Sequence, residues 1–285
     1  MLSRSQYVEL SRGSSTAIDG IYWRPFSNWS IGENVAKYPK LFWPLLLVIR
    51  NLKLNWLPRR LPFHYFADGI ASKLPMSFLA DQDFTRCYER MIQAAGTATD
   101  PGLHFRIHQA IWAARHASGV EGDFVECGTG RGMVMSAVLE ALTDWNCGTK
   151  TVWLLDTFSP YSLDPESGLN DPSRGSRWNY AIDVQSTEKN FQNWNRVRLV
   201  PGRLPESLSQ LDCQRIAFLH LDLNNTVSER RVLETLWQRL SSGAVVLFDD
   251  YGQSVTQQKA MDELVAERGH SILTTGSGQG LLVRL

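Results

Sequence analysis

The chain has 285 residues, of which 43% are hydrophobic and 20% are charged, so it can bury the core of one large α/β domain with an appendage. Lys and Arg together number 29, as do Asp and Glu, and the formal net charge is zero. Nucleic-acid-binding proteins usually carry a basic excess, so this balance argues against nucleic acid as the partner.

Four cysteines are spread along the chain without a CxxC pair: Cys87, Cys127, Cys147 and Cys213. Zinc and iron–sulfur sites need clustered thiolates or nearby histidines, so neither is expected. The first 18 residues are polar and lack the apolar stretch of a signal peptide. We therefore expect a cytoplasmic protein with reduced thiols.

Residues 1–78 are expected to form an N-terminal extension, largely helical or irregular, ahead of a main domain over residues 79–285. The extension contains a nine-residue apolar run, residues 41–49 (LFWPLLLVI), flanked by Lys and Arg. Spanning a bilayer takes about 20 residues, and Pro44 interrupts the run, so we predict no transmembrane span. The favoured interpretation is a helix packed on the core or on the second subunit of a homodimer. The alternative is weak contact with a membrane surface or with an apolar small molecule.

The main domain is predicted to begin with two helices, residues 79–95 and a strongly amphipathic helix over residues 105–117. From residue 123 onward, strand-like runs alternate with helical periods, a pattern typical of βαβ units around a parallel sheet. The predicted strands are residues 123–126, 151–156, 197–200, 215–222 and 244–249. The predicted helices between them are residues 132–142, 229–240 and 257–268. Residues 271–275 and 280–284, joined by a Gly-rich turn, predict a closing antiparallel hairpin.

A glycine-rich loop follows the first predicted strand and opens a helix. Its glycines allow a tight turn and a close approach of the backbone to a ligand, and N–H groups at a helix start suit an anionic group. The spacing is GxGxG, because residue 133 is Met, whereas dinucleotide-binding proteins use GxGxxG. A strand–turn–helix corner without a ligand is the alternative. The predicted cofactor contacts in this loop are Glu126, Cys127, Gly128, Thr129, Gly130 and Gly132.

The second predicted strand ends at Asp156, followed by Thr157. An acid in this position can accept hydrogen bonds from both hydroxyls of a ribose. A glycine loop and an acid in consecutive βα units together favour a nucleoside-containing cofactor. His220, on a later strand, is interpreted as flanking the cofactor.

Two further strands end in acids, Asp222 on one and Asp249 with Asp250 on the other. The carboxyl ends of neighbouring parallel strands line one crevice, so these three side chains are expected to meet. Crowded carboxylates repel each other unless a cation joins them, and oxygen ligands suit Mg²⁺. The alternative is that Asp249 or Asp250 caps the segment that follows.

Several of these stretches resemble the macrocin-type (TylF-like) O-methyltransferases, a family of metal-dependent class I enzymes. They are residues 121–132 (EGDFVECGTGRG), 153–158 (WLLDTF), 220–224 (HLDLN) and 242–252 (SGAVVLFDDYG), and residues 279–282 (QGLL) also look typical of the family. The resemblance implies the seven-stranded Rossmann-like methyltransferase sheet, S-adenosylmethionine as cofactor and a sugar or natural-product hydroxyl as acceptor. By position it implies metal binding at Asp222, Asp249 and Asp250 and a general-base role for Asp222. The family often carries a further acid close to the position of Asn224.

Two other functions stay open beside metal-assisted O-methylation. One is a non-catalytic S-adenosylmethionine-binding protein of the same fold, and the other is an NAD-dependent oxidoreductase, which the GxGxG spacing disfavours. The sequence does not separate O-methylation from N- or C-methylation. Residues 159–188 are interpreted as a lid or as a surface insertion. Arg106 and Arg115 are not assigned a role, since each could reach the cofactor or face solvent.

Overall fold

The computed structural model describes residues 65–72, 74–96, 100–159, 183–252 and 254–285. The chain divides into two compact units, Met1–Ser77 and Phe78–Leu285. The apolar run of residues 41–49 lies outside the described residues, and so does most of the predicted lid, residues 160–182. No helix in the described ranges is both long and apolar enough to cross a membrane.

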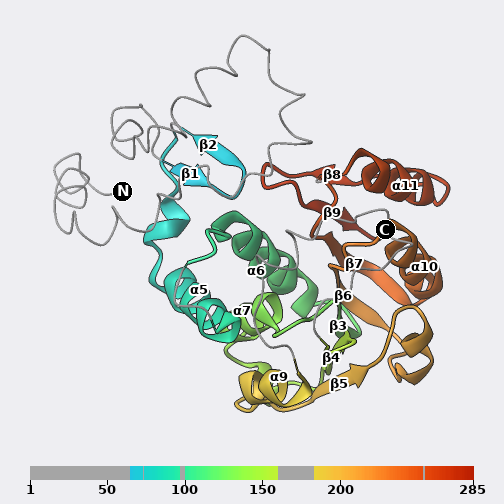
Figure 1. Cartoon of the computed structure of the whole chain (residues 1–285), viewed down its shortest axis with the longest axis horizontal. Helices are drawn as coiled ribbons and strands as arrows, with labels where there is room; N and C mark the ends of the chain where they lie inside the picture. The colour runs from blue at the N-terminus through green and yellow to red at the C-terminus, as the bar shows by residue number, and fades with distance from the viewer. Residues whose placement is uncertain (1–64, 73, 97–99, 160–182, 253) are drawn as a thin grey trace, which may run out of the picture. The chain divides into compact units, whose positions relative to one another are not determined.

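The described part of the first unit contains a two-stranded antiparallel hairpin, β1 (Tyr65–Ala67) and β2 (Ile70–Ser72), visible in Figure 1. Asp68 and Gly69 connect the strands with φ angles of 53° and 72°. Positive φ at both central residues is what a type I′ turn requires, and Asp-Gly favours it. This hairpin lies in a stretch for which we expected helical or irregular structure.

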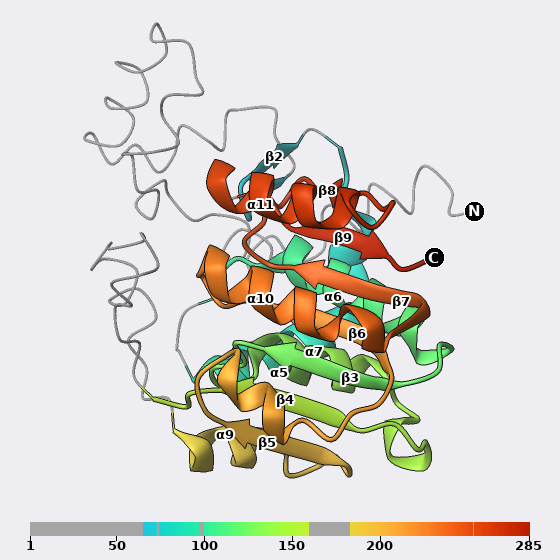
Figure 2. The same cartoon turned by 90° about the vertical axis from the view of Figure 1, so that its right-hand side faces the viewer.

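The second unit is built on a seven-stranded sheet with the strand order β5-β4-β3-β6-β7-β9-β8. Neighbouring strands from β5 to β7 run parallel, whereas β9 is antiparallel to both β7 and β8 (Figure 2). The predicted seven-stranded α/β fold with a closing antiparallel hairpin is therefore confirmed. The strands are β3 (Asp123–Cys127), β4 (Val152–Asp156), β5 (Val197–Pro201), β6 (Ile216–Leu221), β7 (Leu240–Phe248), β8 (Leu273–Thr274) and β9 (Gly280–Val283).

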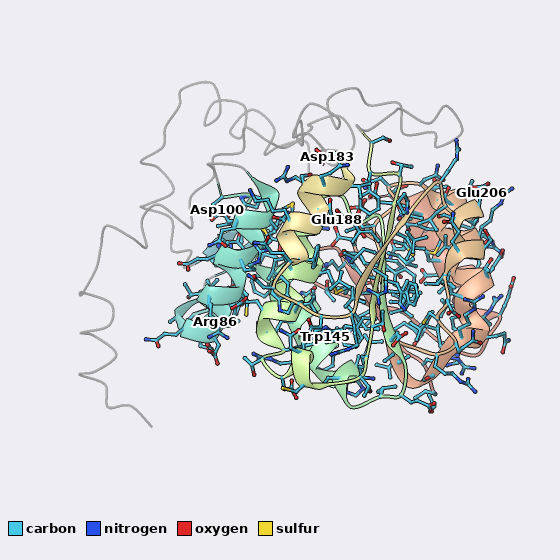
Figure 3. The ribbon with its side chains drawn as sticks, turned by 90° about the horizontal axis from the view of Figure 1, so that it is seen from below. Arg86, Asp100, Trp145, Asp183, Glu188 and Glu206 are labelled. Carbon is cyan, nitrogen blue, oxygen red and sulfur yellow. The ribbon has the colours of Figure 1, made fainter. Side chains whose placement is uncertain are left out.

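Helices cover both faces of this sheet (Figure 3). The α-helices are α5 (Gln82–Ala95), α6 (His104–Ser118), α7 (Met133–Ala141), α9 (Val184–Phe191), α10 (Thr226–Leu236) and α11 (Val255–Ala266). The 3₁₀ helices are η5 (Ser77–Ala80), η6 (Trp145–Cys147), η8 (Glu206–Gln210) and η9 (Trp237–Arg239). One core joins α6, α7 and α9 to the sheet, and a second joins η8, α10 and α11 to the opposite face. A third cluster packs α5 onto α6 and α7.

Helix α6 is buried on two sides, which the expected amphipathic pattern does not describe. Ala110, Ala114 and Ala117 pack toward the sheet, while Ile107 and Ile111 pack in the cluster that contains α5. Small alanine side chains let the helix lie close to the strands. Its position above the sheet matters for the site, because α6 carries a charged residue into it.

Several predicted boundaries are wrong, and among them α10 begins at Thr226 and ends at Leu236 where we expected residues 229–240. Strand β7 begins at Leu240 instead of residue 244 and includes Gly243, which has φ 85°. Helix α9 begins at Val184, with Asp183 accepting a hydrogen bond from the Ser186 N–H at 2.6 Å, so it occupies the end of the predicted lid segment.

Candidate functional site

The glycine loop connects β3 to α7 and lies against the end of β6. Gly128, Gly130 and Gly132 have φ angles of 89°, 53° and 79°, a region that residues with a side chain rarely adopt. A Cβ atom at Gly128 would stand 1.8 Å from the carbonyl oxygen of Asp222. The Asp222 N–H in turn donates to the Cys127 carbonyl at 2.9 Å. The loop and the residue after β6 are therefore held together, main chain against main chain.

Asp156 lies at the end of β4 and binds the loop from the other side. Its Oδ2 accepts a hydrogen bond from the Gly130 N–H and its Oδ1 from the Phe158 N–H, both at 2.8 Å. The Thr157 hydroxyl donates to the same Oδ1 at 3.3 Å. A carboxylate has about four acceptor positions, so a ribose contact remains available to it and stays a prediction.

The side chains of the residues next to these glycines point in different directions. The Cys127 thiol is fully buried in the core, and burial raises its pKa well above the usual range, so this residue offers a ligand only its main chain. The Thr129 hydroxyl is buried and donates to the Glu126 carbonyl at 3.4 Å. Thr157 is exposed. No described contact tests the predicted cofactor role of any of the three.

Glu126 and His220 form a buried pair next to the loop. Side chains alternate along a strand, and Glu126 of β3 is the register partner of His220 of β6, so both point toward α6. Glu126 Oε1 lies 3.0 Å from His220 Nδ1, and both residues are no more than 2% exposed. Burial raises the pKa of Glu126, although His220 opposes the rise.

His220 also lies between two acids, since its Nε2 is 3.7 Å from Asp249 Oδ1. Burial alone would lower the pKa of His220, but the carboxylates of Asp249 and Glu126 outweigh burial and raise it to about 10. A histidine that is already protonated at neutral pH accepts no further proton. His220 therefore suits a bridging role between the loop and the acids and does not suit the role of general base.

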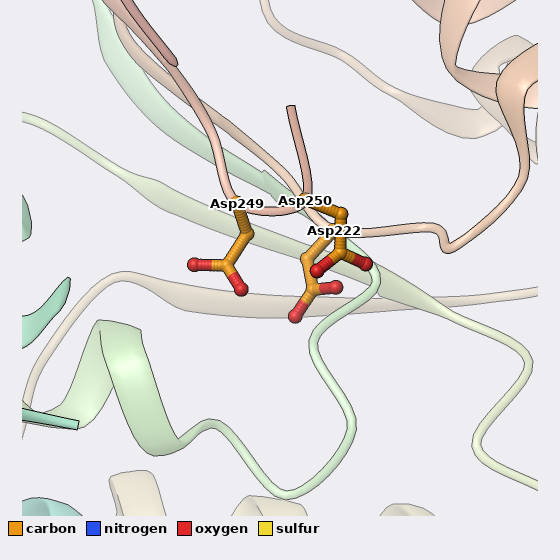
Figure 4. Close-up of side chains that lie close together, drawn as sticks. All are labelled: Asp222, Asp249 and Asp250. Atoms are coloured by element: carbon orange, nitrogen blue, oxygen red, sulfur yellow. The ribbon is translucent and has the colours of Figure 1, made fainter. Parts of the chain in front are cut away.

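The structure brings the three predicted acids together at the carboxyl ends of β6 and β7 (Figure 4). Single oxygen atoms of Asp222, Asp249 and Asp250 all lie within 4.8 Å of one another. Burial raises the pKa of Asp222 well above its ordinary range, and the charges of Asp249 and Asp250 raise it further. The Asn224 amide donates to Asp222 Oδ1 at 3.0 Å, so in this chain the residue acts as a donor to the cluster.

Two residues without a predicted role bind Asp249. Arg106 of α6 donates to its carboxylate and, at 2.8 Å, to its carbonyl oxygen, and Gln279 Nε2 donates to Oδ1 at 2.7 Å. Burial alone would raise the pKa of Asp249, but Arg106, His220 and Gln279 outweigh burial and hold the pKa below its usual range. Their sequence signals are weak, since Arg106 lies in a predicted helix ahead of the first sheet strand and Gln279 belongs to a short stretch that resembles the family.

Glu229 is a further acid, fully buried beside the cluster, and sequence reasoning missed it. Its Oε1 accepts from the Leu223 N–H at 3.1 Å, and its Oε2 accepts from Gln257 Nε2 at 2.5 Å. Burial, followed by the charge of Asp250, raises the pKa of Glu229 to about 8. Glu229 thereby links the residue after Asp222 to α11. Its only sequence signal is an acid in the first turn of a helix that follows two asparagines.

The raised pKa of Glu229 predicts a pH-dependent stability that Glu229→Gln should remove. Between about pH 4.5 and pH 8 the unfolded chain releases this proton and the folded chain keeps it, so the free energy of unfolding falls with rising pH by about 1.4 kcal/mol per unit. Urea unfolding at pH 5 and pH 8.5 measures the effect. From pH 5 to pH 8.5, we expect the free energy of unfolding of the wild type to fall by at least about 2 kcal/mol more than that of Glu229→Gln. Glu234→Gln, an exposed change on the same helix, should run parallel to the wild type, and parallel behaviour of Glu229→Gln would contradict the assignment.

With this geometry in place, comparison with known proteins gives a consistent result. The family model of the macrocin O-methyltransferases (TylF) matches residues 105–272. The chain is 31% identical over 150 residues to the 8-demethyl-8-(2,3-dimethoxy-alpha-L-rhamnosyl)-tetracenomycin-C 4'-O-methyltransferase of Streptomyces olivaceus, which covers 47% of this chain and 55% of the relative. It is 27% identical over 143 residues to the mycinamicin III 3''-O-methyltransferase of Micromonospora griseorubida, which covers 47% of this chain and 56% of the relative.

A third relative, the demethyldecarbamoylnovobiocin O-methyltransferase of Streptomyces niveus, is 28% identical over 156 residues, which cover 52% of this chain and 60% of the relative. The chain thus spans between 55% and 60% of the length of these relatives. Among solved structures, the O-methyltransferase NovP is similar with a TM-score of 0.57 at 22% identity, over 73% of this chain and 98% of NovP. The likeness to NovP shows a shared fold.

Proposed function

Because the chain belongs to the TylF macrocin O-methyltransferase family, we propose that it is an S-adenosylmethionine-dependent methyltransferase acting on a hydroxyl of a sugar or small natural product. The three relatives are all named as O-methyltransferases, and one of the names includes a rhamnosyl group. The observation that carries the proposal is the meeting of the glycine loop, Asp156 and the acid cluster at adjacent strand ends. Such a crevice can hold a nucleoside cofactor beside an acceptor.

In the proposed complex, the residues of this chain hold the cofactor along β3 and β4. The glycines let the loop backbone approach the cofactor closely, and the start of α7 at Met133 faces its carboxylate end. Asp156, already fixed by the Gly130 N–H, accepts from the ribose hydroxyls. Glu126 and His220 support the loop from below as a buried pair. Each of these cofactor contacts is a proposal.

The proposed reaction is an in-line displacement at the methyl carbon. The carbon–sulfur bond of the sulfonium breaks while a bond forms to the acceptor oxygen, and S-adenosylhomocysteine leaves. Asp222 takes the acceptor proton on a carboxylate oxygen. Its position supports this role, because Asp222 directly follows β6 and its main chain lies against the glycine loop.

The acid cluster also fits a divalent cation. Carboxylate oxygens of Asp222, Asp249 and Asp250 lie within 4.8 Å of one another, and hard oxygen donors are those that Mg²⁺ prefers. A bound Mg²⁺ would polarise the acceptor hydroxyl and lower its pKa. Asp249 already binds Arg106 and Gln279, so a cation at this carboxylate would share it with both residues.

A second candidate function is a non-catalytic S-adenosylmethionine-binding protein. Two observations favour it over a metal-dependent enzyme: Asn224 donates to Asp222, and Arg106 already neutralises Asp249. Either contact could replace a metal that the reaction requires. This candidate predicts cofactor binding without turnover. The homodimer, the cytoplasmic location and the weak membrane contact stay predictions.

A labelled-methyl transfer assay over hydroxylated acceptors tests the proposal. The assay is run once with Mg²⁺ and once with a chelator. We expect label to enter sugar or glycoside acceptors, and we expect the chelator to lower the rate of transfer at least about tenfold. Calorimetry with S-adenosylhomocysteine runs beside it. Transfer that is unchanged by the chelator would remove the metal from the mechanism. Cofactor binding without transfer would favour the non-catalytic protein, and absence of binding would contradict both.

A further inference from the structure

Arg106 brings a permanent positive charge to the acid cluster. It lies in the first turn of α6 and is largely buried, with 11% of its side chain exposed. Its Nη1 donates to the Asp249 carboxylate and lies 3.9 Å from Asp250 Oδ1. Its Nη2 donates to the Ser277 carbonyl at 3.4 Å, in the turn between β8 and β9. Contacts with two separate segments hold the guanidinium against the acids.

The three acids of the cluster do not have equal partners. Both carboxylate oxygens of Asp249 accept hydrogen bonds from the protein, Oδ2 from Arg106 and Oδ1 from Gln279. Asp222 accepts from Asn224 with Oδ1. A cation held by all three acids would therefore share Asp249 with a fixed guanidinium. Two like charges on one carboxylate repel each other.

We propose that Arg106 competes with a divalent cation for Asp249 and thereby sets the metal affinity of the cluster. This inference rests on the proposed function, because it concerns the same acid cluster. Arginine keeps its charge at every physiological pH and binds carboxylates through a rigid fork, so it is a constant competitor. It also partly neutralises the three carboxylates when no metal is bound, which allows the empty cluster to stay folded.

The direct test is the affinity for Mn²⁺ alone, measured by calorimetry and by electron paramagnetic resonance of the free ion. Arg106→Gln removes the competing charge, and we expect the Kd for Mn²⁺ to fall at least about tenfold. Arg115→Gln is the matched control, since Arg115 is an exposed arginine on the same helix, and its Kd should equal that of the wild type. Arg106→Lys keeps the charge and should stay within about threefold of the wild type.

Thermal unfolding gives a second readout if Arg106→Gln folds poorly. Without the guanidinium the cluster loses its arginine counter-charge, so Mn²⁺ should raise the Tm of this variant more than that of the wild type. If the wild type binds Mn²⁺ and folded Arg106→Gln binds it equally or more weakly, the competition by Arg106 is overturned and the proposed function is not. Absence of Mn²⁺ binding to both proteins would overturn it together with the metal part of the proposed function. Methyl transfer measured in the chelator would then test whether the protein is a methyltransferase that needs no metal.

Discussion

Asp222→Asn is expected to lower kcat by about 10²- to 10⁴-fold, the range that general acid–base catalysis contributes. Asparagine keeps the size of the side chain and the main-chain contact with Cys127, but it cannot take a proton at neutral pH. Burial and its two acidic neighbours raise the pKa of the Asp222 carboxyl, an effect that the neutral asparagine amide does not have. Affinity for S-adenosylhomocysteine should change by no more than about threefold.

Single-turnover methyl transfer, with cofactor affinity measured separately, isolates this effect from binding. Asp212→Asn is the control, because Asp212 is an exposed acid four residues before β6. Retention of more than about a tenth of the wild-type rate would contradict the role of Asp222 as base. Titrating Mn²⁺ into the same variant then separates two roles. A weakened Mn²⁺ affinity indicates a metal ligand, and an unchanged affinity indicates a base alone.

Asp249 is a poor choice for such a test even though the sequence predicts it as a metal ligand. Arg106, Gln279 and His220 all depend on its carboxylate. Removing one partner from a buried charged network leaves the other partner unpaired, at a cost of about 3–5 kcal/mol. Loss of activity in Asp249→Ala would therefore report damage to the fold as readily as loss of a metal.

The sheet and the position of the acids could be predicted because both follow from local patterns. Apolar runs ending in acids give parallel strands, and the carboxyl ends of parallel strands share one edge of a sheet, so Asp222 and the Asp249–Asp250 pair were expected to meet. The glycine spacing likewise predicted the turn between β3 and α7. These predictions need no knowledge of how the helices pack.

The partners of the acids could not be predicted, because they depend on tertiary packing. Arg106 and Asp249 are 143 residues apart, and their contact requires the particular rotation of α6 above the sheet. The sequence of α6 does not indicate that rotation, because the helix carries buried apolar residues on two of its sides. From the sequence, Glu229 is an ordinary acid in the first turn of a helix. It is buried because α10 packs beside α11, where Gln257 donates to it. The β1–β2 hairpin, in contrast, has a local signal in the sequence, because Asp68-Gly69 is a dipeptide typical of a type I′ turn.

Gly128→Ala is expected to destabilise the fold by about 3 kcal/mol or more and to weaken S-adenosylhomocysteine binding at least about 100-fold. The added Cβ atom would lie 1.8 Å from the carbonyl oxygen of Asp222 and 2.6 Å from its carbonyl carbon, both main-chain atoms. A flexible side chain could move aside, whereas main chain at the end of β6 cannot. Relief would require the ends of β3 and β6 to separate, which displaces the loop and Asp222 together.

Gly269→Ala separates this overlap from the cost of the backbone conformation alone. Gly269 has φ 73°, similar to the 89° of Gly128, but nothing lies within 4 Å of its added Cβ atom. Its substitution should cost only about 1 kcal/mol in urea unfolding and leave cofactor binding unchanged. If the two variants lost equal stability and both bound S-adenosylhomocysteine normally, the close approach of the loop to Asp222 would not be needed. The overlap at Gly128 is with main-chain atoms of Asp222 and not with a ligand. If only Gly128→Ala loses stability and cofactor binding, the contact between the glycine loop and Asp222 supports both the cofactor site and the acceptor site.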